Sequence, residues 1–162
     1  MSVNKYRPHV LVLPEDQANI DIADGFLLHQ LHDPRAIDVL PSAGGWSRVR
    51  DEFAATHVVE MRKYPRRHMI LMVDFDEQGN RLNAVQEVIP VDLADRVFVV
   101  GVWSQPEALC VATGWSLEEL GSKLAMECCD GSRAVWNHDL LRHNAPEVAR
   151  MTNLLRPFLF VD

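Results

Sequence analysis

The sequence is poor in cysteine and has no long hydrophobic run, and each shortage excludes a class of protein. Its three cysteines are an odd number and two of them, Cys128 and Cys129, are adjacent, so we expect reduced thiols rather than a disulfide framework. Every apolar segment is shorter than the roughly 18 residues that suggest a membrane span. We therefore expect a globular protein without a membrane partner.

Positive charge is also in short supply. Lysine and arginine total 16 against 23 aspartates and glutamates, which gives a formal net charge of -7. This balance argues against a broad electrostatic surface for nucleic acid, because phosphate contacts need cationic side chains. Residues 61–68, "MRKYPRRH", form a local exception. They read either as a solvated helix end and loop or as a local basic patch, in which Arg66 and Arg67 are the candidate phosphate contacts.

Length and composition fit one globular domain. The chain has 162 residues, of which 48% are hydrophobic and 24% charged. The first apolar run, "HVLVLP", is too short for a secretory signal and is followed by "EDQ" where small residues would mark a cleavage site. We therefore expect a cytoplasmic location.

The hydrophobic pattern alternates between strands and helices. Continuous short apolar runs predict buried strands at residues 9–13, 36–40, 68–73 and 96–102. Apolar residues at helical spacing predict connecting helices at residues 16–31, 47–61 and 82–88. This order is typical of a parallel sheet covered by helices. We predict an α/β fold with a four-stranded, mainly parallel sheet.

The chain becomes helical after the fourth predicted strand. Helices are expected at residues 106–113, 116–128 and 145–157, and Ser116 with Glu119 resembles a capping box at the start of the second. We predict a single domain, with an α/β core over residues 8–104 and a helical extension over residues 105–162.

Acidic residues follow three of the predicted strands. Glu15 and Asp16 come after the first, Asp74 and Asp76 after the third, and Glu107 after the fourth. Side chains two apart on a strand point the same way, so Asp74 and Asp76 share one side if the extended conformation persists. In an open parallel sheet the carboxyl ends of the strands form the working edge. The alternative is an ordinary strand exit, because Asp also favours turns.

A cluster of carboxylates at this edge would need a positive partner. Two such charges at 4 Å repel by roughly 4 kcal/mol at an effective dielectric of 20. The cluster should therefore hold a proton or a hard cation, and oxygen ligands favour Mg²⁺ or Mn²⁺.

Four segments, "VLVLPED", "VLPSAGGW", "LMVDFDE" and "VFVVGV", resemble the TOPRIM fold of topoisomerases, primases, OLD-type nucleases and related defence proteins. The segment "SQPEALCVATG" is similar to the helix start that follows the core in small TOPRIM-like proteins of OLD and abortive-infection type. The resemblance covers residues 10–114. It implies metal-dependent phosphodiester chemistry on nucleic acid, in phage defence or a mobile element.

The resemblance also implies roles for particular residues. Glu15 would be the general acid or base, and Asp74 and Asp76 the Mg²⁺ ligands, while Asp16 and Glu107 are possible additional acidic members. In the family a glycine usually follows the glutamate, where this chain has Asp16. Neither tyrosine lies in a nucleophile context, which excludes a topoisomerase. An ATPase domain of the OLD type would have to come from a partner protein.

Three other interpretations remain. "VDFDEQGN" also looks like the Asp-x-Asp-Gly-Thr signature of haloacid-dehalogenase-type phosphatases, with Glu77 and Gln78 in place of Gly-Thr. A phospho-receiver domain would use Asp74 as acceptor, but it needs a lysine after a fifth strand. The third is a TOPRIM-like binding or regulatory subunit of a larger assembly, without catalysis.

Overall fold

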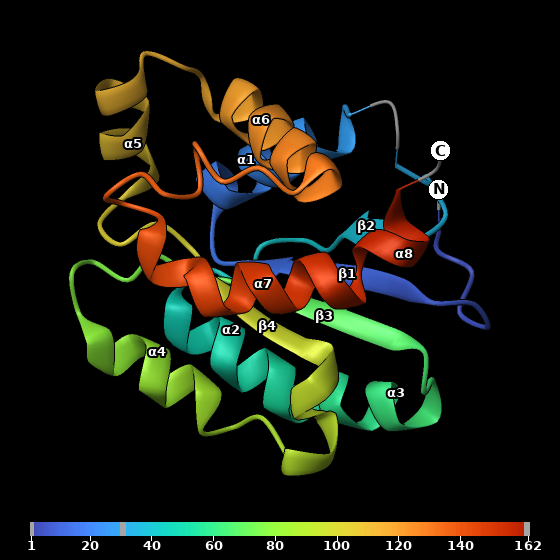
Figure 1. The fold of residues 1–162 in the computed structure, drawn as a ribbon. Coiled ribbons are helices and arrows are strands. Elements are labelled where there is room, and N and C mark those ends of the chain that lie inside the picture. Colours follow the sequence, from blue (N-terminus) through green and yellow to red (C-terminus); the bar gives the residue numbers. More distant parts are fainter. Residues whose placement is uncertain (1, 30–31, 161–162) are drawn as a thin grey trace.

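The sheet of this protein is parallel throughout. A computed structural model describes residues 2–29 and 32–160, and its strands lie in the order β2-β1-β3-β4 (Figure 1). Each neighbouring pair is parallel. The predicted α/β class and four-stranded sheet are therefore confirmed. The strands are β1 (His9–Pro14), β2 (Ile37–Val39), β3 (Arg67–Met72) and β4 (Val97–Val100).

Helices connect the strands as the periodicity predicted. The connection between β2 and β3 passes through α2, a π-helical segment at Phe53–His57 and α3 without leaving helical conformation. A 3-10 helix at Val91–Arg96 leads directly into β4. The α-helices of this part are α1 (Gln17–Leu27), α2 (Trp46–Glu52), α3 (Val58–Lys63) and α4 (Gly79–Gln86).

The C-terminal region is helical, as expected. The predicted cap is present, since the Ser116 hydroxyl accepts a hydrogen bond from the Glu119 N–H at 3.1 Å. The predicted helix at 145–157 is two helices, because Pro157 has no N–H to continue the first of them. The elements are α5 (Pro106–Thr113), α6 (Leu117–Asp130), a 3-10 turn (Arg142–Asn144), α7 (Ala145–Leu154) and α8 (Arg156–Leu159).

Alternating side chains of the strands build two hydrophobic clusters, one on each face of the sheet. The first cluster packs under α1, α6 and α7, and its buried strand residues are Val10, Val12, Ile37, Ile70, Met72, Phe98 and Val100. The second packs against α2, α3 and α4, and its strand residues are Leu11, Leu13, Met69, Leu71, Val97 and Val99. Figure 1 shows the two helical layers on opposite sides of the sheet. The C-terminal helices thus complete one face of the α/β core.

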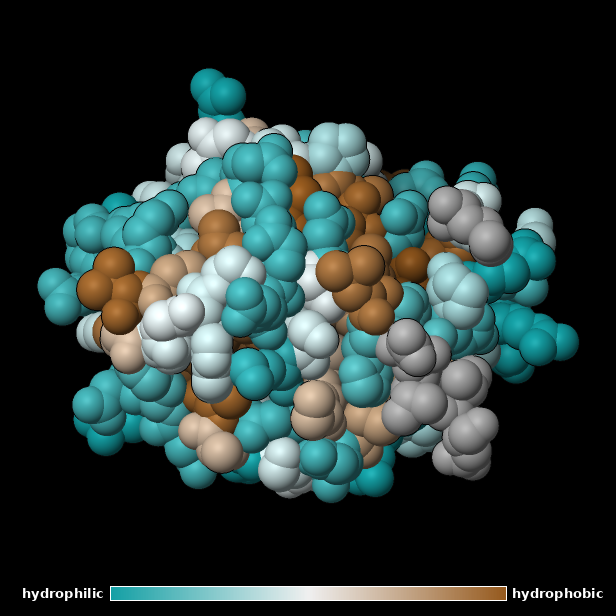
Figure 2. Space-filling view, turned by 90° about the horizontal axis from the view of Figure 1, so that it is seen from above, coloured by the Kyte–Doolittle hydropathy of each residue, from teal (hydrophilic) through white to brown (hydrophobic). Residues whose placement is uncertain are grey.

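Helices α1 and α6 lie in close contact within the first layer. A Cβ atom on Gly121 would lie 1.9 Å from the carbonyl oxygen of Ile22, so only glycine allows the two backbones to approach this closely. On the outer face of this layer, hydrophobic side chains form small patches separated by hydrophilic ones (Figure 2). Within residues 2–29 and 32–160, no helix is both long and apolar enough to cross a membrane.

Candidate metal centre

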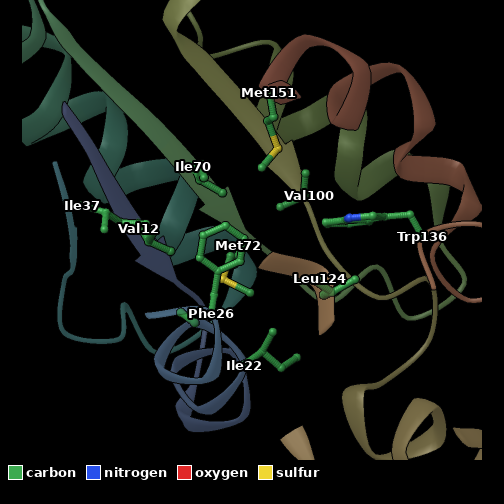
Figure 3. A pocket seen from close by; sticks show the side chains of 11 residues that line it. Val12, Ile22, Phe26, Ile37, Ile70, Met72, Val100, Leu124, Trp136 and Met151 are labelled. Carbon is green, nitrogen blue, oxygen red and sulfur yellow. The ribbon is translucent and has the colours of Figure 1, made fainter. Parts of the chain in front are cut away.

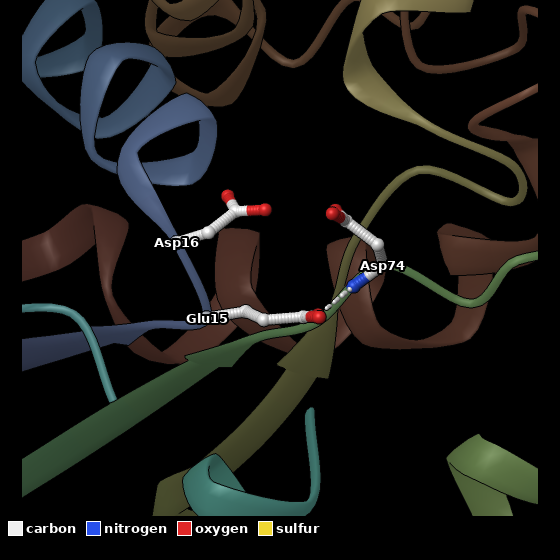
Figure 4. Close-up of side chains that lie close together, drawn as sticks. All are labelled: Glu15, Asp16 and Asp74. Carbon is white, nitrogen blue, oxygen red and sulfur yellow. Dashed lines mark hydrogen bonds between the residues drawn. The ribbon is translucent and has the colours of Figure 1, made fainter. Parts of the chain in front are cut away.

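The carboxyl ends of β1 and β3 leave the sheet side by side. Pro14 of β1 is the register partner of Met72 of β3, so the residues that follow each strand begin at the same edge. One carboxylate oxygen from each of Glu15, Asp16 and Asp74 lies within 4.8 Å of the others. Figure 4 shows the three side chains converging on one space from the two strand ends. The structure therefore brings together acidic residues that are far apart in the sequence.

Glu15 is fixed through both its backbone and its side chain. Its N–H donates to the Met72 carbonyl at 3.0 Å, and its own carbonyl accepts from Gly44 at 2.9 Å and Gly45 at 3.2 Å. These glycines have φ angles of 95° and 148°, a region that favours glycine. The Glu15 Oε2 accepts from the Asp74 N–H at 2.6 Å. The glycine turn between β2 and α2 thus positions the glutamate.

Asp16 and Asp74 are linked by Asn19. Asp16 is the N-cap of α1, and its Oδ1 accepts from the Asn19 backbone N–H at 3.1 Å and from the Asn19 amide at 2.9 Å. The same amide donates to Asp74 Oδ1 at 3.2 Å. Asn19 is fully buried. Asn19 was not among the predicted site residues, although Asp-x-x-Asn at a helix start is a local signal for the cap itself.

Burial and mutual repulsion disfavour full ionisation of this cluster. Burial, followed by the charges of Asp16 and Glu15, raises the pKa of Asp74 to about 7. Burial also raises the pKa of Glu15, against the hydrogen bond from the Asp74 N–H. Arg81 lies nearby, but its Nη1 donates to the backbone carbonyl of Asp74 at 2.9 Å. At neutral pH the three carboxyl groups therefore favour retention of a proton or binding of a cation.

The structure places Asp76 outside this group. The extended conformation ends before it, because Asp76 and Glu77 have φ angles of 49° and 58°. Their N–H groups donate to the carbonyls of Ser104 and Trp103, so the chain turns toward the segment after β4. The Asp76 carboxylate instead contacts Arg81 and Gln105, each at 3.4 Å. The expected common direction of Asp74 and Asp76 is thus not found, and Asp16 is the third member.

The other candidate residues also lie apart from the cluster. Glu107 is exposed in the first turn of α5 and is not a member of the group. Arg67 is 5% exposed at the amino end of β3, where its Nε donates to His9 Nε2 at 3.0 Å. Arg66 is exposed beside it. Since β3 separates these arginines from Asp74, the distance is roughly 20 Å at 3.3 Å per strand residue.

The cluster fits a hard divalent cation. Its ligand atoms are carboxylate oxygens, which Mg²⁺ and Mn²⁺ prefer, and Mg²⁺ usually keeps several waters beside one or two carboxylates. Asn19 and the Asp74 N–H orient the carboxylates, as outer hydrogen bonds do in metal sites. No protein-family model, curated protein or solved structure matches this chain.

Proposed function

We propose that this protein carries out Mg²⁺- or Mn²⁺-dependent phosphodiester chemistry on nucleic acid. The observation that carries the proposal is the convergence of Glu15, Asp16 and Asp74 at the carboxyl edge of β1 and β3. An open parallel sheet binds its ligands at this edge. The placement of a glutamate after β1 and an aspartate after β3 supports the TOPRIM-like relationship suggested by the sequence motifs.

Each acidic residue has a proposed role. Asp74 and Asp16 would hold the ion, and Glu15 is the general acid or base, since burial raises its pKa, the direction in which enzymes shift a catalytic glutamate. When bound, the ion polarises a phosphate oxygen and stabilises the charge that develops on it. Asn19 holds both aspartates in position through its amide. Asp76 lies outside the three-residue cluster. Its carboxylate contacts Arg81, which also donates to the backbone carbonyl of Asp74.

A basic and aromatic surface at the other end of the strands supports nucleic acid as the substrate. Arg66 lines a pocket there with Lys5, Tyr6, Lys63 and Tyr64. Tyr6 is 80% exposed, so its ring is free to stack on a base, while the cationic side chains contact phosphates. Arg67 supports this surface from below, with its guanidinium 4.9 Å from the Tyr64 ring centroid.

The biological setting is proposed from the resemblance to small OLD-type and abortive-infection proteins. The proposed setting is phage defence or a mobile element, with an ATPase as a partner protein. A cytoplasmic location is proposed separately, from a first apolar run, "HVLVLP", that is too short for a secretory signal. A non-catalytic binding or regulatory subunit is the second candidate function. It is favoured by the position of Asp76, which contacts Arg81 and Gln105 rather than the other acidic residues.

A cleavage assay separates the two candidates. The parent protein is incubated with single- and double-stranded DNA and RNA in Mg²⁺, in Mn²⁺ and in EDTA. We expect cleavage that depends on the metal and falls roughly 10² to 10⁴-fold in Glu15→Gln, the usual contribution of a general acid or base. Glu107→Gln is the matched control and should cleave like the parent. Metal binding and nucleic-acid binding without cleavage would instead favour the regulatory subunit.

A further inference from the structure

Two hollows of this protein differ in size and lining. The space on the first face of the sheet, between the strands and helices α1, α6 and α7, holds about 60 Å³ and presents only apolar atoms (Figure 3). It is a packing void, well below the range of small-molecule sites. The pocket at the amino end of β1 and β3 holds about 320 Å³ and has both polar and apolar walls. Its volume lies within that range.

Two turns form the walls of this amino-end pocket. In the turn before β1, the Asn4 side chain accepts from the Tyr6 N–H at 3.1 Å. The turn after α3 contains Pro65, whose ring fixes its φ angle. The His9 N–H donates to the Arg66 carbonyl at 3.2 Å and joins the two turns. Figure 1 shows the start of β1 and the end of α3 at the same end of the sheet. The pocket is thus largely formed before a ligand enters.

Other basic residues stabilise the helix end beside the pocket. Arg96 Nη1 donates to the carbonyls of Met61 and Tyr64 at 3.1 and 3.2 Å, so the carbonyl end of α3 already has a positive partner. Arg62 pairs with Asp92 at 3.1 Å. These contacts account for the helix end without the cations that line the pocket.

Three cations around the pocket have no acidic partner. Within residues 2–29 and 32–160, Lys5, Lys63 and Arg66 make no ion pair, and all three are exposed. The Nζ atoms of Lys5 and Lys63 lie 5.3 Å and 5.4 Å from the centroid of the Tyr64 ring, and Arg66 lines the same pocket. Unpaired positive charges that gather at one pocket, in a protein with a net charge of -7, indicate a compact anionic ligand.

Two tyrosines add an aromatic surface to this positive charge. The ring centroids of Tyr6 and Tyr64 are 6.4 Å apart, and the rings meet edge to face at 73°. Tyr6 is 80% exposed, so one ring is accessible to a planar group. Bases of single-stranded nucleic acid stack on such rings. The pocket therefore combines the two features that recognise a nucleotide, a stacking surface for its base and cations for its phosphate.

The unpaired charge is confined to the pocket and does not continue as a stripe. A nucleic-acid backbone that passes along a surface needs a cationic groove to follow. Beside the pocket, Arg62 is paired with Asp92, and Arg67 is buried against His9. A phosphate monoester carries a charge of about -1.5 to -2 at pH 7, compared with about -1 for a phosphate within the backbone. A terminal phosphate therefore matches this gathered charge better than an internal one.

We propose that the amino-end pocket binds one nucleotide with a terminal phosphate, either free or at the end of a single strand. The base stacks on Tyr6, and the phosphate contacts Lys5, Lys63 and Arg66. The inference narrows the substrate class of the proposed function, and it rests on that function for its role in cleavage. Binding itself does not use the metal centre, which lies roughly 20 Å away at the other end of the strands.

Nucleotide binding in EDTA tests the pocket apart from the metal centre. Calorimetry with the full chain compares 5′-AMP and 3′-AMP with adenosine and inorganic phosphate. We expect one saturable site for a nucleotide, and at least roughly tenfold weaker binding of adenosine and of phosphate, since each lacks one of the two kinds of contact. Neither nucleotide binding saturably, or inorganic phosphate binding as tightly as the nucleotides, would overturn the proposal.

Short single strands distinguish a strand end from a free nucleotide. The probes are a linear strand with a terminal phosphate, the same strand without it, and the same strand closed into a circle. If the pocket takes strand ends, the phosphorylated strand should bind at least roughly tenfold tighter than the other two. If it takes free nucleotides, no strand should bind as tightly as AMP. A circle that binds as tightly as both AMP and the phosphorylated strand would contradict the proposal, because it has no end.

Matched variants locate the binding. Lys5→Ala combined with Lys63→Ala removes two exposed cations and should weaken nucleotide binding at least roughly tenfold. Lys123→Ala removes a lysine that lies over the Trp115 ring on another part of the surface, and should bind like the parent. Tyr6→Ala should weaken binding roughly fivefold to a hundredfold, whereas Tyr6→Phe keeps the stacking ring and should not. Undiminished binding by the folded double variant would refute the assignment.

The outcomes separate this inference from the proposed cleavage. A parent protein that binds the nucleotide in EDTA but cleaves no nucleic acid would refute the proposed function and leave the pocket in place. A parent protein that cleaves nucleic acid but binds neither AMP nor phosphorylated strand ends would refute the pocket and leave the proposed function in place.

Discussion

The two ends of the β1–β3 pair carry opposite charges and are stabilised in different ways. At the amino end, Arg67 donates to His9 and stacks over Tyr64. Burial lowers the pKa of His9, which favours the neutral imidazole that accepts this hydrogen bond. At the carboxyl end, Glu15, Asp16 and Asp74 face one another, and their bonds come from Asn19 and from backbone N–H groups.

The difference shows which end would gain more from a bound cation. At the amino end the buried Arg67 guanidinium has a neutral partner, His9, and lies over the Tyr64 ring. The carboxyl end collects like charges in a partly buried space, where the proton on Asp74 is the internal means of reducing repulsion. A cation would replace that proton and remove the repulsion between the carboxylates. The same pair of strands thus carries a buried Arg67 network at one end, beneath the surface proposed to contact nucleic acid, and the candidate metal centre at the other.

Removing one charge from the carboxyl end should have the largest effect. We expect Asp74→Asn to raise the melting temperature of the metal-free protein above pH 7, because it removes a buried like charge. The same variant should lose the stabilisation by Mg²⁺, which for the parent is about 2.7 kcal/mol at a concentration of 100 times Kd. Thermal unfolding with and without Mg²⁺ measures both effects. An unchanged Mg²⁺ response in Asp74→Asn would remove the basis for the metal centre.

Removing the Arg67 contacts at the amino end should lower the stability of the fold without changing the affinity for Mg²⁺. Arg67→Ala leaves His9 Nε2 without its donor and removes the stacking over Tyr64, so we expect a loss of roughly 2 kcal/mol in the free energy of unfolding. Urea unfolding measures this loss. Arg66→Ala is the control, since Arg66 is exposed, and should change stability by less than about 0.5 kcal/mol. A lower Mg²⁺ affinity in Arg67→Ala would mean that the two ends are coupled.

The pH dependence should differ between the metal-free and the metal-bound protein. The pKa of Asp74 is raised from 3.8 to about 7 in the folded chain. The stabilising contribution of this group is therefore complete below pH 4 and is lost as pH rises to about 7. Because Mg²⁺ competes with the proton, its affinity should rise up to about tenfold per pH unit over this range and level off above it.

Titration of Mg²⁺ at pH 5, 6, 7 and 8 checks this dependence. The measured quantity is the Mg²⁺-induced shift in melting temperature, with Asp74→Asn as the control in which the pH dependence should largely disappear. A Mg²⁺ affinity that is the same at pH 5 and pH 8 would show that no proton is displaced from the cluster.

The smallest effect on Mg²⁺ affinity should come from Asp76, the second aspartate of the Asp-x-Asp segment after β3. Asp16→Asn should weaken Mg²⁺ binding roughly tenfold or more, as expected for loss of a charged ligand near the ion. Asp76→Asn should weaken it less than about threefold, because its carboxylate contacts Arg81 and Gln105 outside the group. Calorimetric titration of the two variants compares them directly. The reverse order would restore Asp76 as the ligand.

The sequence predicted much of the fold and part of the candidate site. Continuous apolar runs identified all four strands to within a few residues, because strands buried on both faces need hydrophobic side chains throughout. Glu15 and Asp74 were identified as the residues at the ends of β1 and β3. Asn19 and Arg81 were not, because their partners depend on how α1 and α4 lie against the strand ends. The TOPRIM-like relationship stays a prediction.

The sequence by itself determined the order of strands and helices and placed acidic residues at the ends of particular strands. Only the tertiary structure decided which carboxylates meet. A turn with positive φ angles takes Asp76 away from the end of β3, while capping of α1 brings Asp16 toward it. The physical reason is that hydrophobic periodicity is a local property of the chain. Convergence of charges, burial of Arg67 and the space on one face of the sheet arise from contacts between distant segments.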